Sequence, residues 1–307
     1  MRFLYPALTC LVTFLHVSAF TQSPPAELYG EGLRAWLKVN TYDPVFDDQG
    51  YNGIRIAMYS YIDEVGGQVE CVYSGFQQPA AAVTFLNPIN AEHIIPQSWF
   101  GSASPMRSDI FNLRPSHESA NSSRSNYPFG EVDDASAQWY GVDAGNNYYS
   151  TTTEPANSAD FSERQGSLWE PREDRKGDVA RQVFYFYTMY PTQAGSISLA
   201  GDINTFYTWH INDPVDVNEL VRNDRAEETQ GNRNPYVDDE NLVHLAWFFQ
   251  PVSGCTYPLA NNYNSAATVD DGTCDFTNSC PEDLSGDGVI NTPDVLQIIS
   301  TFGSSCQ

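Results

Sequence analysis

The uneven distribution of basic residues and cysteines along the chain constrains its fold more than any other feature. Residues 20–250 contain all 14 basic residues that follow position 19, whereas residues 251–307 contain seven acidic residues and no basic one. Four of the six cysteines lie in the last 53 residues. A segment this short buries little apolar surface, so it needs disulfides or metal ions to hold a fold. The sequence therefore predicts one large domain over residues 20–250 and small cross-linked modules after it.

The first 19 residues have the composition of a secretory signal peptide. Arg2 supplies a short basic start, an apolar stretch follows, and small residues end at Ala19, as a cleavage site requires. The stretch is short for a membrane span, and the sequence contains no second run of this kind. We therefore expect a secreted, soluble protein whose cysteines meet an oxidising environment.

The cysteines that remain after cleavage predict two local disulfides in the tail. Pairing Cys255 with Cys274 and Cys280 with Cys306 closes short loops, although the other pairings of these four stay open. Cys71 is then left over, and its apolar neighbours favour a small buried side chain over a reactive thiol. We expect a disulfide module over residues 251–279 and a second module over residues 280–307.

The large domain carries signals for both helices and strands, which predicts the α+β class with helices dominant. Residues 69–73 alternate as a half-buried strand does. Residues 143–167 are polar and rich in Asn, Thr and Ser, so we expect a long loop there. Apolar residues at helical spacing predict helices in three segments, 54–62, 179–187 and 238–249, the last of them capped by Asp238.

Residues 91–132 carry the pattern with the most chemical information. They predict a strand, a loop, a second strand and a helix. The β-prone residues 94–95 form the first strand, and residues 110–113 form the second, which ends at Pro115. Ser116 is a candidate cap for the helix that follows.

A hairpin followed by a helix would bring Glu92 and His93 close to Asn121, and these residue types suit the hydrolysis of a phosphodiester. Asn121 shares one face of the predicted helix with His117 and Arg124. A carboxylate and an amide oxygen are hard ligands that match Mg²⁺. A neutral histidine can take a proton from water near neutral pH, and an arginine can stabilise charge that develops on the phosphate.

The same segment resembles the endonuclease I family of secreted bacterial nucleases, which belongs to the ββα-metal (HNH-like) superfamily. The resemblance extends over roughly residues 26–250. It rests on five ordered blocks, EHIIPQSW from Glu92, NLRP from Asn112, NSSRSNYPFG from Asn121, KGDVAR from Lys176 and QGNRNPYVD from Gln230. So many matches in order are far more specific than one short motif.

The resemblance implies a helix-rich nuclease domain built around a ββα-metal motif, and it implies roles for individual residues. His93 would be the general base that activates water. Glu92 and Asn121 would hold one catalytic Mg²⁺, with Mn²⁺ as an alternative. Asn112 would orient His93 from the second strand, and the product would carry a 5′-phosphate.

Contacts to the phosphates of the substrate are expected from arginines, whose planar guanidinium groups match phosphate oxygens. Pairing of Arg233 with nearby acids such as Asp238 is an equally open alternative. Arg124 is the first candidate for a phosphate contact, with Arg107 and Arg114 behind it. Asn126 and Arg233 are further candidates for substrate binding.

An aspartate-rich segment near the C-terminus resembles a dockerin repeat with an EF-hand-like calcium loop. Dockerins carry two repeats and this chain has one, so we expect a structural Ca²⁺ and leave a cohesin-like or cell-surface partner open. The candidate ligands fall in EF-hand register at Asp283, Ser285, Asp287, the backbone carbonyl of Val289, Asn291 and Asp294.

Taken together, these features predict a secreted, monomeric, Mg²⁺-dependent endonuclease without sequence specificity, acting on DNA, with RNA left open. The formal net charge of −24 excludes a broad basic DNA-binding face. Residues 20–250 alone carry 14 basic and 32 acidic residues, so phosphates would be met locally and binding would depend weakly on salt. The alternative is a calcium-dependent adhesion protein whose nuclease-like domain is inactive.

Overall fold

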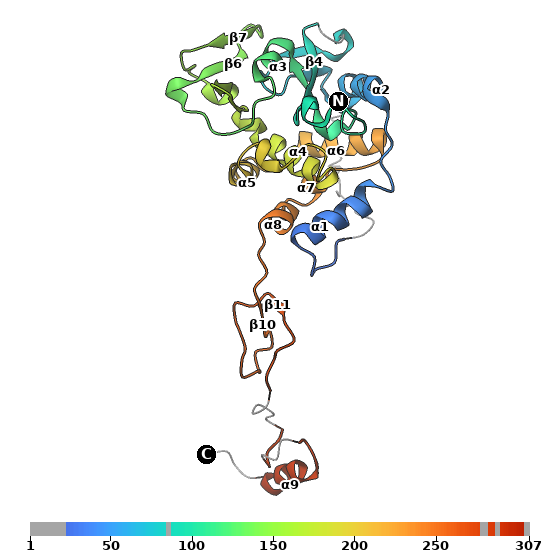
Figure 1. The fold of residues 1–307 in the computed structure, drawn as a ribbon, viewed down its shortest axis with the longest axis vertical. Helices are drawn as coiled ribbons and strands as arrows, with labels where there is room; N and C mark the ends of the chain where they lie inside the picture. The colour runs from blue at the N-terminus through green and yellow to red at the C-terminus, as the bar shows by residue number, and fades with distance from the viewer. Residues whose placement is uncertain (1–22, 84–86, 277–281, 286–288, 304–307) are drawn as a thin grey trace, which may run out of the picture. The chain divides into compact units, whose positions relative to one another are not determined.

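A computed structural model describes residues 23–83, 87–276, 282–285 and 289–303 of the chain (Figure 1). The chain divides after Phe248 into two compact units. The predicted signal peptide, Cys280, Asp287 and Cys306 lie outside the described residues. Within the described part, no helix combines the length and the apolar composition needed to cross a membrane.

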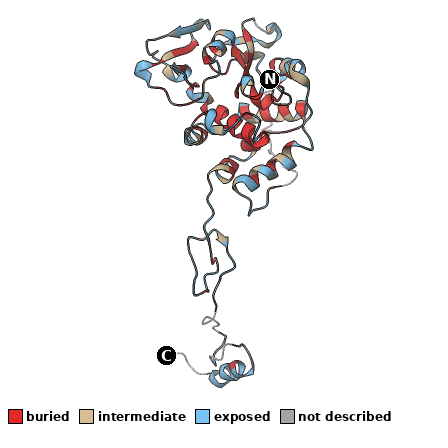
Figure 2. Ribbon diagram, viewed as in Figure 1, coloured by how far each residue is buried: buried red, intermediate tan, exposed pale blue. Residues whose placement is uncertain are grey.

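Helices of the first unit surround α4 (Lys176–Met189), every residue of which is buried. Figure 2 shows the buried residues of this unit concentrated in its middle. The mostly apolar C-terminal half of α4 packs in the core, and the charged residues of its first turns are held by ion pairs. The other helices are α1 (Gly30–Leu37), α2 (Gly50–Ala57), α3 (Glu118–Arg124), α5 (Ile203–Asn212), α6 (Val217–Gln230), α7 (Pro235–Asp238) and α8 (Asn241–Trp247).

Two of the three predicted helices are confirmed, and the third begins later than predicted. Residues 54–62 lie in α2 and in the π-helical turn Met58–Ile62 that continues it. Residues 179–187 lie in α4. Asp238 does not cap the last helix, because it ends α7, and α8 begins at Asn241, whose N–H is accepted by Asp239.

Three small antiparallel sheets complete the described part of the first unit, so the mixture of helices and strands confirms the α+β class. The predicted strand at residues 69–73 is shorter than expected, because only Gln68–Glu70 pairs and the chain then turns. The sheets are β1–β2–β3 (Glu64–Val65, Gln68–Glu70, Gln77–Pro79), β4–β5 (Ile89–His93, Leu113–His117) and β7–β6–β8–β9 (Tyr148–Thr151, Gln138–Val142, Ser162–Gln165, Leu168–Glu170).

The strand–strand–helix order predicted for residues 91–132 is present, but its strands are displaced in sequence. β4 ends at His93, before the predicted residues 94–95, and β5 begins where the predicted second strand ends. Pro115 lies inside β5, opposite Ala91. Its carbonyl accepts a hydrogen bond from Val72 N–H, so the carbonyl points away from β4. The N–H of a residue in an antiparallel strand points to the same side as its carbonyl. The missing N–H of Pro115 therefore removes no hydrogen bond between β4 and β5.

The residue that caps α3 also differs from the prediction. His117, not Ser116, is the N-cap, and its Nδ1 accepts from Ser119 N–H at 3.2 Å. The imidazole is stacked on Tyr148, with ring centres 4.2 Å apart and planes inclined by 5°. His117 therefore joins α3 to the four-stranded sheet, and its ring is packed against Tyr148.

The predicted loop over residues 143–167 is wrong, because it contains β7 and β8 of the four-stranded sheet. β7 contains a Ser and a Thr beside its two tyrosines, and all four side chains of β8 are polar, namely Ser, Glu, Arg and Gln. Their pairing with β6 is stabilised by a small apolar cluster of Trp139, Phe161 and Leu168. Polar strands of this kind give no apolar alternation that a sequence pattern could detect.

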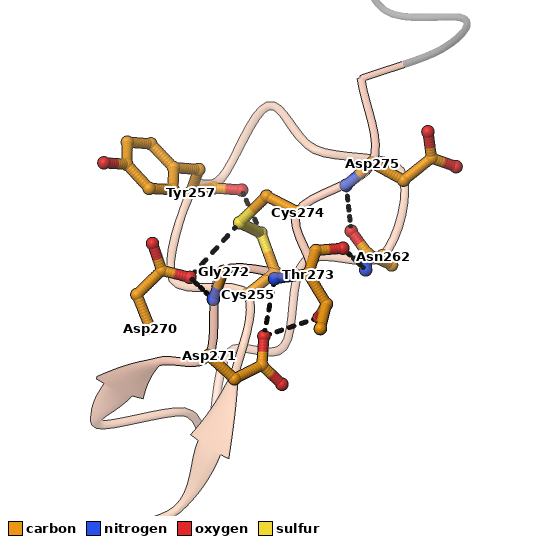
Figure 3. The surroundings of a disulfide bond; sticks show 9 residues. All are labelled: Cys255, Tyr257, Asn262, Asp270, Asp271, Gly272, Thr273, Cys274 and Asp275. Atoms are coloured by element: carbon orange, nitrogen blue, oxygen red, sulfur yellow. Dashed lines mark hydrogen bonds between the residues drawn. A yellow bond between two sulfur atoms is a disulfide. The ribbon is translucent and has the colours of Figure 1, made fainter.

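The second unit contains a short parallel pair, β10 (Ser253–Gly254) with β11 (Val269–Asp270), and the helix α9 (Thr292–Thr301). The predicted Cys255–Cys274 disulfide is confirmed. Figure 3 shows how the loop is held around it: Asp271 accepts from Thr273 N–H, and Asn262 donates to the Thr273 carbonyl. Cys71, in the first unit, is a free and buried thiol as predicted.

Candidate active site

A cavity of about 510 Å³ opens between α2, β4 and the C-terminal end of α3. The structure brings five of the predicted site residues to its wall, and most of the remaining lining residues are polar. The predicted residues at this wall are Glu92, His93, Asn121, Arg124 and Asn126, and the others are Tyr51, Asn90, Ala91, Pro96, Gln97, Ser98 and Ser125.

His93 is held in one tautomer by the backbone of the loop that follows β4. Its Nε2 lies 3.1 Å from the carbonyl oxygen of Arg107, and a carbonyl can only accept, so Nε2 carries the proton. Nδ1 is then the basic nitrogen. Burial, together with the nearby cations Arg107 and Arg124, lowers the pKa of His93 to about 4, against the opposite effect of its hydrogen bond to the Arg107 carbonyl. The imidazole is therefore neutral at pH 7 and able to accept a proton.

The ring of His93 is fixed between aromatic side chains. Tyr51 of α2 is stacked on it at 5.6 Å between ring centres, and Phe100 meets it edge-on at 6.4 Å. These contacts restrict rotation of the imidazole, so the orientation of Nδ1 is set before any substrate arrives.

Glu92 is buried at the end of β4 and is approached by two donors. Tyr73 O–H donates to its Oε1 at 2.9 Å, and Arg124 Nε lies 3.4 Å from the same oxygen. Oε2 takes part in neither contact. Burial raises the pKa of Glu92 to about 7, against the opposite effects of Arg124 and Tyr73. A divalent cation in the cavity would favour the ionised carboxylate.

Asn121 is held by hydrogen bonds from its amide nitrogen. Nδ2 donates to Oδ1 of Asn90 at 2.7 Å and to the carbonyl of Ala91 at 3.4 Å. The backbone carbonyl can only accept, so it fixes which end of the amide is the nitrogen. Oδ1 takes part in neither bond, and the residue lines the cavity.

Arg124 supports the walls of the cavity. Its Nη2 donates to the Ile94 carbonyl at 2.7 Å, its Nη1 donates to the Ser125 carbonyl at 3.1 Å, and only 1% of the residue is exposed. With Nε beside Glu92, the guanidinium is surrounded by acceptors of the protein. The structure therefore places this first-choice phosphate contact in a supporting position.

Ser125, which follows Arg124 at the rim, has a backbone conformation that side chains rarely adopt. Its φ is 57° and its ψ is −127°. A non-glycine residue in this region is strained, by on the order of 1–3 kcal/mol. The sharp turn ends α3 and leads the chain to Asn126, which is exposed at the cavity.

Asn112 acts on the loops beside His93, and its side-chain hydrogen bonds go to the backbone of these loops, not to the imidazole ring. Its Oδ1 accepts from Ile95 N–H at 2.8 Å, and its Nδ2 donates to the Met106 carbonyl at 3.2 Å. Asn112 thereby ties the segment after β4 to the residue that precedes Arg107, whose carbonyl holds His93. Asn112 is therefore a positioning residue that acts on His93 through the backbone of Arg107.

Arg107 lies at the same side of the cavity as Tyr51. The centre of its guanidinium is 4.4 Å from the centre of the Tyr51 ring. Among the described residues it has no carboxylate partner, and its Nε has no hydrogen-bond acceptor.

The other two predicted arginines lie away from the cavity. Arg114 is buried in a separate network, where it contacts Asp178 at 2.9 Å and Gln182 at 3.0 Å. Arg233 contacts Asp238 and Asp224 at 2.7 Å. The pairing with Asp238, one of the two alternatives for Arg233, is therefore the one observed.

Three residues that contact the proposed catalytic and metal-binding side chains were not predicted from the sequence: Tyr51, Tyr73 and Asn90. Asn90 lies two residues before Glu92 on one strand, so the period-2 geometry of β4 was a signal that both share a face. Tyr51 and Tyr73 come from segments distant in sequence, and no local pattern indicates where they lie.

The residues at the cavity fit a magnesium ion. Glu92 and Asn121 offer one carboxylate and one amide oxygen, and Mg²⁺ in proteins commonly takes one or two such ligands and completes its shell with water and phosphate oxygens. Among the described residues, no group of three or more His, Cys, Asp or Glu side chains converges as a metal site. A softer, fully protein-bound metal therefore has no candidate cage in this part of the chain.

The calcium-loop candidates lie in the second unit, where Asp294 is the central residue. Its carboxylate accepts from Ser285 N–H at 2.9 Å and from Asn291 N–H at 2.7 Å, which closes the loop onto the start of α9. Ser285 Oγ also donates to Asp283 at 3.2 Å. Val289 belongs to the same segment, and Asp287 lies outside the described residues.

Comparison with known proteins places this arrangement in a family. The family model described as Endonuclease I matches residues 28–241. Extracellular ribonucleases of Bacillus amyloliquefaciens and Bacillus subtilis are each 32% identical to the chain over 174 residues, which is 52% of this chain. The match covers 53% and 54% of the two relatives, so the chain spans about half the length of the curated relatives it matches.

Proposed function

The chain belongs to the endonuclease I family, and we propose that it is a secreted, metal-dependent endonuclease that hydrolyses phosphodiester bonds in DNA or RNA. The observation that carries this proposal is the state of His93. The residue is a neutral imidazole at the wall of a polar cavity, with Nε2–H committed to the Arg107 carbonyl and Nδ1 left as the acceptor. Beside it lie a carboxylate and an amide suited to Mg²⁺.

In the proposed reaction, Nδ1 of His93 takes a proton from water as the water oxygen attacks phosphorus. The bond between phosphorus and the 3′ oxygen breaks, the 3′ oxygen takes a proton from a solvent water, and the product carries a 5′-phosphate. Mg²⁺, held by Glu92 and Asn121, would polarise the phosphate and stabilise the leaving oxygen. A positioned base of this kind typically contributes about 10²–10⁴-fold to the rate.

The surrounding residues keep these groups in place. Tyr73 and Arg124 hold Glu92, Asn90 holds Asn121, and the pair Asn112 and Arg107 fixes His93 through backbone carbonyls. We assign β4, β5 and α3 to the ββα-metal motif on this basis. Arg107 replaces Arg124 as the first candidate for a phosphate contact, because its guanidinium has no carboxylate partner among the described residues.

Secretion and the role of the tail are parts of the same proposal. Both Bacillus relatives are named extracellular ribonucleases, which agrees with a signal peptide at residues 1–19 and keeps RNA beside DNA as a substrate. The tail would bind a structural Ca²⁺ through Asp283, Ser285 and Asn291, next to the ordered carboxylate of Asp294. A cell-surface or cohesin-like partner for it is a further proposal.

Digestion of plasmid DNA and of RNA with Mg²⁺ tests the function. We expect the wild-type protein to degrade nucleic acid with Mg²⁺ and not with EDTA. We expect His93→Ala to be at least about 100-fold slower. His244→Ala is the matched control, because His244 contacts Tyr207 and does not line this cavity. Equal digestion by the wild type and His93→Ala would remove His93 as the base. No digestion by the wild type would favour the adhesion alternative.

A further inference from the structure

Most of the cations in the first unit are neutralised by carboxylates of the same unit. Ten of the 14 basic residues that follow position 19 form ion pairs within 4.0 Å. Arg34 donates to the Ala246 carbonyl and lies over Trp247. The positive charge that a polyanion could meet is therefore much smaller than the count of basic residues suggests.

Two basic residues, Arg107 and Arg164, have no carboxylate partner among the described residues. Neither lines the cavity itself, but each contacts a residue that lines it or is next to one that does. Arg107 lies over the ring of Tyr51, which lines the cavity from α2. Arg164, on β8, donates from Nη1 to the carbonyl of Ser123 at 3.3 Å. Ser123 immediately precedes Arg124, which lines the cavity from α3.

The residues that the two arginines contact belong to different walls of the cavity. Figure 1 shows β4 with α2 on one side and α3 with β6 on the other. The packing agrees with this order, because Tyr51 of α2 is stacked on His93 of β4, and α3 packs on β4 as well. Arg107 therefore contacts the α2 wall and Arg164 the α3 wall.

We infer that Arg164 and Arg107 hold the phosphates on the two sides of the scissile bond, so that the nucleic acid crosses the cavity from α2 toward β8 of the four-stranded sheet. This inference rests on the proposed function. Elsewhere the strand would meet a surface with an excess of acidic residues, since residues 20–250 carry 14 basic and 32 acidic residues. Arginine suits this role because its planar fork binds two phosphate oxygens.

Arg164 is held ready for such a contact. Its guanidinium is fixed by the Ser123 carbonyl and lies 6.0 Å from the centre of the Tyr140 ring, so binding costs little side-chain entropy. The Ser123 carbonyl accepts from Nη1 alone, and the other N–H groups of the guanidinium remain for phosphate. A purely structural role, closing the last turn of α3, is the competing explanation of the same bond.

The salt dependence of binding separates the two explanations. The His93→Ala protein with Mg²⁺ is titrated into a fluorescein-labelled single-stranded oligonucleotide at several NaCl concentrations, and Kd is read from anisotropy. Two phosphate contacts predict a slope of log Kd against log salt near 1.4, at about 0.7 for each contact. We expect Arg164→Gln to weaken binding severalfold and to lower the slope by about 0.7.

Two further variants complete the test. Arg164→Lys keeps the charge and loses the fork, so we expect it to retain most of the slope. Lys38→Gln removes the same charge from a residue paired with Asp43, away from the cavity, and we expect no change. An unchanged slope in Arg164→Gln, or a Lys variant as weak as the Gln variant, would overturn the inference. Failure of the wild type to digest nucleic acid would instead overturn the proposed function.

Discussion

Asn90 fixes the orientation of Asn121 by accepting a 2.7 Å hydrogen bond from its amide nitrogen, which leaves the amide oxygen of Asn121 out of that bond. Both residues line the cavity. In the proposed site the oxygen is the metal ligand, so Asn90 determines which atom is presented. Groups that orient a ligand in this way commonly change metal affinity by about 10–100-fold when they are removed.

Replacement of Asn90 tests this relationship directly. We expect Asn90→Leu, which cannot accept a hydrogen bond, to weaken Mg²⁺ binding by about 10-fold or more in calorimetric titrations. Asn90→Asp keeps an acceptor at the same place and should retain or strengthen binding. If both variants bind Mg²⁺ equally, Asn90 has no orienting role.

The buried ion pair of Glu92 with Arg124 should be strongly coupled in stability. Arg124→Met leaves Glu92 buried without its cation, and we expect a loss of about 3–5 kcal/mol in the free energy of unfolding. Combining it with Glu92→Gln should recover a part of that loss. Urea unfolding of the two single variants and the double variant measures the coupling, and strictly additive losses would show that the two side chains do not interact.

The strained turn at Ser125 predicts a stabilising substitution. Glycine adopts a φ of 57° without the clash that a side chain causes, so we expect Ser125→Gly to raise the free energy of unfolding by about 1 kcal/mol. Ser122→Gly, three residues earlier inside α3, should lower it by a similar amount. Thermal unfolding of both variants gives the comparison. A destabilised Ser125→Gly would show that the turn is unstrained.

Glu163 should make the first unit less stable as the pH rises. Its carboxylate is buried opposite Glu170, one oxygen lacks a hydrogen-bond partner among the described residues, and burial raises its pKa to about 8 from an ordinary 4.5. Between these values the unfolded chain has lost the proton that the folded protein keeps. The unfolded state is therefore favoured increasingly from about pH 4.5 to 8.

Glu163→Gln removes this dependence. We expect the variant to be more stable than the wild type by about 1–2 kcal/mol at pH 8, with the difference disappearing near pH 4.5. Unfolding curves at several pH values measure it. A difference that does not change with pH would mean that Glu163 titrates normally in the folded protein.

The disulfide should stabilise the second unit alone. The bridge joins cysteines 19 residues apart, and a loop of this size contributes about 3 kcal/mol. We expect the double variant Cys255→Ala, Cys274→Ala to be cut faster by proteases after Phe248, with an unchanged Tm for the first unit. Cys71→Ser is the contrasting control, since it places a hydroxyl in the buried core of the first unit. Equal cutting rates would show that the tail folds without the bridge.

The grouping at the cavity could be predicted because β4, β5 and α3 follow one another in the sequence. Local order was enough to bring Glu92, His93 and Asn121 together. The strand bounds could not be predicted, because the most apolar residues, 94–95 and 110–113, lie largely outside the strands and pack in the core. In β4, the residues that form the site, Asn90, Glu92 and His93, are polar.

The roles of the arginines could not be predicted either, because each depends on partners distant in sequence. Arg114 meets Asp178 and Asp63, which are 64 and 51 residues away. Arg164 lies on a polar strand within the segment predicted to be a loop. Sequence patterns report local periodicity and charge, and they contain no information on which distant carboxylate neutralises which cation.

The internal pairing of ten cations has a consequence for transport. Outside cells, nucleic acid is often embedded in gels of anionic polysaccharide. A protein with an excess of acidic residues is repelled by such a gel, because like charges repel. It would diffuse through the matrix without being retained there, and it would leave a cut strand quickly.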